Sequence, residues 1–101
     1  MTLTADRLRG ELEALLAETL RVGDSPLKAD QAAERCASLA RRVPDAEVGE
    51  EARARIGGAL ADAERVLRRD DDGREAAKHV QRAVAQLAPR ERKPSPFLDD
   101  E

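Results

Sequence analysis

Aromatic side chains are almost absent from this sequence of 101 residues, which contains one Phe and no Trp or Tyr. Its β-branched residues are also few, with one Ile, six Val and three Thr. Because β-branched and aromatic residues are the ones that favour strands, the chain has little from which to build a sheet. The sequence therefore predicts an all-α protein, made mainly of the helix formers Ala, Leu, Arg and Glu.

Other absences exclude whole classes of protein. Cys36 is the single cysteine and cannot form an internal disulfide, which excludes a disulfide-stapled secreted scaffold. The sequence has neither the ~20 apolar residues of a membrane span nor an N-terminal run typical of a signal peptide, so we expect a cytoplasmic protein that binds no membrane. Asp and Glu outnumber Lys and Arg by 21 to 18, which argues against a nucleic-acid partner. The excess of 15 Arg over 3 Lys favours a GC-rich, bacterial gene.

Alanine dominates the apolar residues, with 19 Ala against twelve Leu, so the core must be thin. Burying one large aliphatic side chain yields about 1.5–3 kcal/mol, while ordering each residue costs about 1.5 kcal/mol. Either the helices pack very closely through Ala, or the chain gains stability from a second copy or a partner.

Helical spacing of apolar residues predicts four helices, over about 5–22, 26–43, 46–69 and 73–88. The expected N-caps are Thr4, Ser25 followed by Pro26, Asp45 and Asp72. In the first helix, Leu16 and Leu20 widen an apolar stripe formed by other leucines. Gly57-Gly58 interrupts the third segment, which marks either a bend or a very close contact and leaves open whether this is one helix or two.

Short connections force neighbouring helices to run antiparallel, which favours an up-down-up-down four-helix bundle. A long helical hairpin that dimerises into a bundle is the alternative. We expect a single helical domain over 1–89 and a flexible, disordered tail over 90–101, because the tail has two prolines and no apolar period.

Few residues suggest chemistry. Glu75 and His79 lie one helical turn apart, as two metal ligands or an acid–base pair would, but a zinc site needs three or four ligands and a surface ion pair explains the spacing. Cys36 falls on an apolar stripe, so we expect a core residue rather than a nucleophile. We predict no catalytic residue, no cofactor and no enzymatic activity, with Glu75 and His79 as the only weak metal candidates.

Charged clusters have structural explanations. Asp70-Asp71-Asp72 lacks the spacing of a calcium loop and suits the positive start of the fourth helix. Arg41-Arg42 and Arg68-Arg69 fall at predicted helix C-termini, where cations complement the helix dipole.

The only aromatic residue, Phe97, is followed by Leu98 and then by acidic residues in the tail. An apolar anchor with a charged rim is typical of a docking peptide, so Phe97 and Leu98 are the predicted partner-binding residues. The sequence favours a non-enzymatic adaptor, regulator or accessory subunit that binds another protein or a second copy of itself. A small inhibitory protein of antitoxin or immunity type is the alternative, and a metal- or ligand-binding bundle is a further one.

Overall fold

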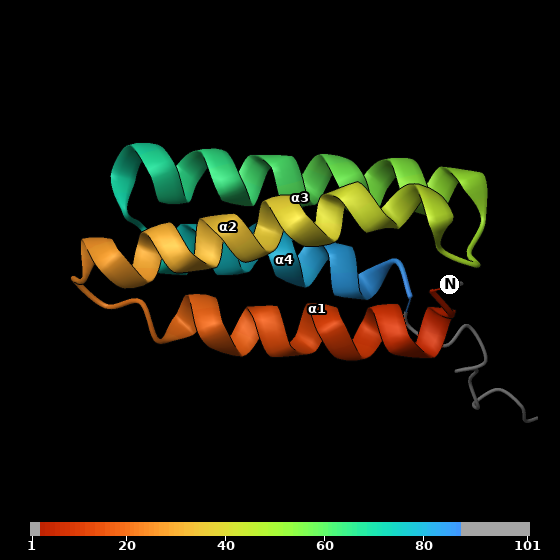
Figure 1. Cartoon of the computed structure of the whole chain (residues 1–101), viewed down its shortest axis with the longest axis horizontal. Coiled ribbons are helices and arrows are strands. Elements are labelled where there is room, and N and C mark those ends of the chain that lie inside the picture. Colours follow the sequence, from red (N-terminus) through yellow and green to blue (C-terminus); the bar gives the residue numbers. More distant parts are fainter. Residues whose placement is uncertain (1–2, 88–101) are drawn as a thin grey trace, which may run out of the picture.

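A computed structural model describes residues 3–87 and shows an all-α bundle of four helices within one chain. The helices are α1 (Ala5–Leu20), α2 (Pro26–Arg42), α3 (Glu50–Asp70) and α4 (Gly73–Ala85), with a short 3-10 turn, η1 (Val43–Asp45), before α3. Consecutive helices run in opposite directions (Figure 1). The predicted up-down-up-down bundle is confirmed, and it needs no dimerised hairpin to supply four helices.

Three of the four predicted N-cap residues cap their helices as expected. The hydroxyl of Thr4 accepts a hydrogen bond from the Arg7 amide at 3.2 Å, and Ser25 accepts one from the Lys28 amide at 3.2 Å. Asp72 accepts one from the Glu75 amide at 3.0 Å. Each bond satisfies a backbone donor that the first helical turn leaves without a partner.

The predicted start of the third helix at residue 46, with Asp45 as cap, is wrong. Asp45 ends η1, and α3 begins only at Glu50, after Gly49, which provides no side-chain cap. Ala46 is extended and pairs with Leu3, and the Glu47 amide donates to the Leu3 carbonyl at 2.7 Å. The start of the chain therefore holds the α2–α3 connection in an extended form.

Gly57 and Gly58 lie inside one continuous α3, so the segment is a single helix. A Cβ atom at either position would meet no atom within 4 Å. The close contact that the sequence suggested for this pair is therefore not made within the described chain.

The core lies along the bundle axis, and nine of the 21 buried apolar residues in the described chain are alanines. The helices α2 and α4 bury mainly alanines, as the composition predicts, and α1 and α3 supply most of the larger residues. The large, fully buried side chains are Leu8, Leu12, Thr19, Val22, Cys36, Ile56, Leu60, Leu67 and Val80. Helix α1 packs against α4 more extensively than against its neighbour in sequence, α2.

Within residues 3–87, no helix is long and apolar enough to cross a membrane. The predicted tail over 90–101 lies outside the described residues, as do its Phe97 and Leu98.

Candidate interaction surface at one end of the bundle

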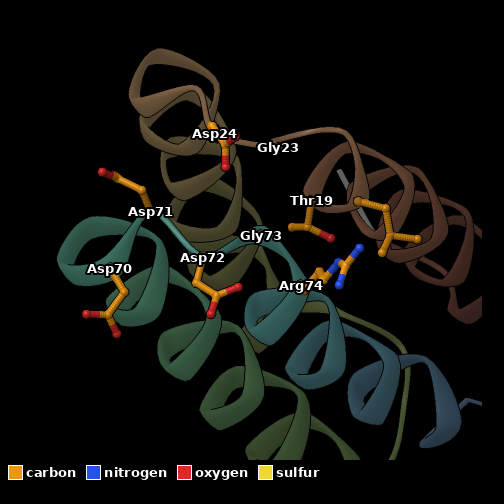
Figure 2. Close-up of a pocket in the computed structure, with 9 residues that line it drawn as sticks. Thr19, Gly23, Asp24, Asp70, Asp71, Asp72, Gly73 and Arg74 are labelled. Atoms are coloured by element: carbon orange, nitrogen blue, oxygen red, sulfur yellow. The ribbon is translucent and has the colours of Figure 1, made fainter.

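The end of the bundle where α1 stops and α4 begins holds a cavity of about 500 Å³ (Figure 2). The α1–α2 and α3–α4 loops supply four of its nine lining residues, and the adjoining ends of α1, α3 and α4 supply the other five. The lining residues are Thr19, Leu20, Gly23, Asp24, Asp70, Asp71, Asp72, Gly73 and Arg74.

Gly73 sets how closely the two helices meet at this end. A Cβ atom on Gly73 would overlap the backbone oxygen of Thr19 and lie 2.7 Å from the Cβ of Val22. The Thr19 hydroxyl donates to the Leu16 carbonyl at 2.7 Å, which satisfies this buried polar group. The N-terminus of α4 is thus held against the C-terminal turn of α1.

Four aspartates, Asp24, Asp70, Asp71 and Asp72, are exposed around the cavity, and we call this group the acidic end. Only Asp72 fulfils the predicted role at the start of α4. Asp70 is the last residue of α3, and Asp71 is its C-cap in the left-handed conformation, with φ of 52°. Both carboxylates lie at the negative end of the α3 dipole, where acidic groups are unfavourable. The dipole explanation for the whole triplet is therefore wrong.

Two leucines are exposed near the acidic end. Leu20 ends α1 with 61% of its surface exposed, and Leu27 lies in the first turn of α2 with 67% exposed. The expectation that Leu20 extends the buried stripe of α1 is wrong, although Leu16 does pack partly against the core. We call Leu20 and Leu27 the leucine pair.

Sequence reasoning did not single out Leu27, although a signal was present. Leu27 lies two positions before Ala29, which starts the buried stripe of α2. Residues two apart on a helix point in different directions, so the stripe itself placed Leu27 away from the core.

The structure brings Glu75 and His79 together, but as part of a charged surface row. The Nε2 atom of His79 lies 3.8 Å from a carboxylate oxygen of Glu75, and the Arg82 guanidinium contacts the other ring nitrogen. Arg82 also lies 3.6 Å from Asp62 of α3. Within residues 3–87, no group of three or more His, Cys, Asp or Glu side chains is arranged to hold a metal ion.

Cys36 is fully buried in the core, as predicted. Burial, with smaller contributions from Glu64 and Glu18, raises the pKa of its thiol to about 12. A thiol needs to ionise to act as a nucleophile or a metal ligand, so this environment opposes both roles.

The basic pairs Arg41-Arg42 and Arg68-Arg69 lie in the last turns of α2 and α3, as the sequence predicts. Arg68 also joins two helices: it contacts Glu64 on its own helix at 2.8 Å, and Asp30 and Glu34 of α2 at 3.6 and 3.5 Å. The helix dipoles and the ion pairs within the bundle therefore explain the positions of both arginine pairs.

Comparison of the chain with protein-family models, with curated proteins and with solved structures finds no match in any of the three. The candidate surface is therefore interpreted from its own geometry and charge.

Proposed function

We propose that this chain is a non-enzymatic cytoplasmic protein that works by protein–protein contact, as an adaptor, regulator or accessory subunit. The observation that carries this proposal is the leucine pair beside the acidic end. Binding surfaces combine a few apolar anchors with a polar, charged rim, and this end of the bundle offers both.

The charge of the surface indicates the kind of partner. Four aspartates surround the cavity, against one cation among its lining residues, Arg74. Asp70 and Asp71 add their charges to the negative end of α3, where they do not serve the stability of the helix. A partner segment with an apolar anchor and neighbouring Lys or Arg would cover the leucines and complement the carboxylates.

The test uses the full-length chain as bait in its own cells. We expect wild-type protein to enrich a specific partner, and the double variant Leu20→Gln with Leu27→Gln to enrich it at least about tenfold less, as loss of a central anchor does. Mass spectrometry quantifies the captured protein. Binding of the purified partner should weaken as salt rises, because the rim charges are exposed.

A matched control separates loss of the surface from loss of the fold. Ala85 is an exposed residue at the opposite end of α4, so Ala85→Gln places the same polar side chain away from the leucine pair. Both proteins should give the helical circular dichroism spectrum of the wild type. Equal capture of the partner by the double variant and the wild type would contradict the proposal.

The acidic end also favours the second candidate, a small inhibitory protein of antitoxin or immunity type. Enzymes that act on nucleic acids bind phosphates through basic surfaces, and a row of carboxylates is suited to block such a surface. A toxin or nuclease gene beside this one would favour the inhibitor. Asp70→Asn with Asp71→Asn should then weaken inhibition of that enzyme in a direct assay.

A further inference from the structure

The exposed face of α3 contains glycines that nothing in the described chain requires. Gly57 and Gly58 have helical backbone, and no atom occupies the space a side chain would fill. Glycine weakens a helix interior relative to alanine, so the pair is unfavourable for the isolated bundle. The absent side chains leave room for another helix to approach α3 closely from outside.

The surface on both sides of these glycines is hollowed. A groove of about 430 Å³ lies between α2 and α3, with Ala40, Val43 and Ala54 in its lining. A second hollow of about 340 Å³ lies between α3 and α4. Gly58 lines both, so no side chain separates the two hollows at this point of α3.

The residues along this face are symmetric about the midpoint of the glycine pair. Ala54 and Ala61 lie equally far from it on either side, and Glu50 and Arg65 lie equally far at the next turns. Spacings of three and four residues keep them all on one side of the helix. Their side chains are exposed, and the two that carry charge, Glu50 and Arg65, have opposite signs.

We propose that a second copy of this chain docks on this face, with the two α3 helices antiparallel and crossing at Gly57 and Gly58. In that arrangement Ala54 of each copy faces Ala61 of the other, and Glu50 of each faces Arg65 of the other. The glycines let the two backbones approach closely. The same patch serves both copies, so the contact closes as a two-fold dimer.

Arg65 is compatible with this contact although it already pairs with Asp62 of its own helix at 2.6 Å. A guanidinium group has five donors, so one carboxylate does not exhaust it. The structure places no ion pair on Glu50 among the described residues. The Glu50 carboxylate of each copy is therefore available to pair with Arg65 of the other, which gives the dimer two such contacts.

This inference concerns a different face from the leucine pair and does not depend on the proposed function. A dimer can form whether or not the acidic end binds a partner, and the variants used in the two tests do not overlap. Each proposal can therefore fail without the other.

The first test is sedimentation equilibrium of the full-length chain over a range of concentrations. We expect a wild-type dimer in reversible equilibrium with monomer, and at least about tenfold weaker association for Gly58→Gln, whose side chain would fill the crossing point. The matched control is Gly10→Gln, since Gly10 is an exposed helical glycine of α1 with equally open surroundings. It should dimerise as the wild type does.

A wild-type chain that remains monomeric at every concentration would overturn the proposal, and so would a dimer that Gly58→Gln leaves intact. Gln favours a helix more than Gly does, so Gly58→Gln should melt no lower than Gly10→Gln at concentrations where both are monomeric. Loss of the dimer would then not reflect misfolding.

The second test determines the antiparallel arrangement by exchanging charges. Glu50→Arg alone and Arg65→Glu alone place like charges opposite each other in a homodimer, so each should associate about tenfold more weakly than the wild type. Mixing the two variants restores opposite charges at both contacts and should give a heterodimer. Failure of the mixture to associate would reject this arrangement of the two helices.

Discussion

Gly73 lies so close to the backbone of Thr19 that a Cβ atom on Gly73 would overlap the Thr19 carbonyl oxygen. Among the glycines of residues 3–87, only Gly73 has neighbouring atoms in the space that a side chain would occupy. The contact joins α1 to α4 at the end of the bundle that carries the cavity, the acidic end and Leu20.

Replacing Gly73 by alanine should therefore destabilise the protein. We expect Gly73→Ala to lower the free energy of unfolding by about 2 kcal/mol, because the backbone of α1 must shift to admit the methyl group. Gly57→Ala is the matched control and should raise it by about 0.5–1 kcal/mol, since its methyl group meets no atom. Urea unfolding of dilute protein, followed by circular dichroism, measures both, and the same sign for the two variants would contradict this account.

Asp71 offers a second test, in which the expected change is a gain of stability. Its left-handed conformation is unfavourable for a residue with a Cβ atom, and its charge lies at the negative end of α3. Asp71→Gly should raise the free energy of unfolding by about 1 kcal/mol. If the acidic end binds a partner, the same variant should weaken that binding, measured by isothermal titration calorimetry. A variant less stable than the wild type would show that Asp71 supports the fold.

Cys36 predicts how stability depends on pH above neutrality. The pKa of the thiol is raised from 9.0 to about 12 in the folded protein, so between these values the unfolded chain loses the thiol proton and the folded chain keeps it. The unfolded state then binds fewer protons, and stability falls as pH rises, by about 1.4 kcal/mol for each pH unit. The Cys36→Ala variant should lack this contribution. The difference in unfolding free energy between the wild type and this variant should therefore shrink from pH 9 upward. Urea unfolding at several pH values measures it, and a constant difference would contradict the raised pKa.

The tail prediction is tested by deletion. The described core consists of residues within 3–87, so removing residues 90–101 takes away none of its members. We expect the shortened chain to keep its unfolding free energy within about 0.5 kcal/mol of the full-length value.

Phe97→Ala with Leu98→Ala, in the full-length chain, should weaken partner binding if these residues form the docking peptide. Undiminished binding by that variant would exclude them as an attachment point.

Local signals predicted most of the helix starts. Thr4, Ser25 and Asp72 each act on a backbone amide three residues away, so the sequence alone contains the whole interaction. The start of α3 was missed because its cause is not local. Ala46 is drawn into pairing with Leu3, a residue that is distant in sequence, and no spacing rule contains that contact.

The candidate site was harder to predict than the fold. Asp70 and Asp71 were assigned to the start of α4, but Asp70 ends α3 and Asp71 is its C-cap, so both meet the negative end of the α3 dipole. Among the glycines, the sequence drew attention to Gly57 and Gly58 because they interrupt a helix. Gly73 is the one pressed against another helix, and its position at a helix start gave no indication of that.

The preference of α1 for α4 over α2 has a consequence for how the molecule is made. Helix α1 can meet its main neighbour only after α2, α3 and α4 have been synthesised, so the α1–α4 contact closes a long stretch of sequence. A linker can join the C-terminal end of α4 to the N-terminal end of α1, and the chain can be opened between α1 and α2. Helices α4 and α1 would then be consecutive in the sequence. Such a rearranged chain brings the pair together over a short loop, and it should fold faster than the natural order.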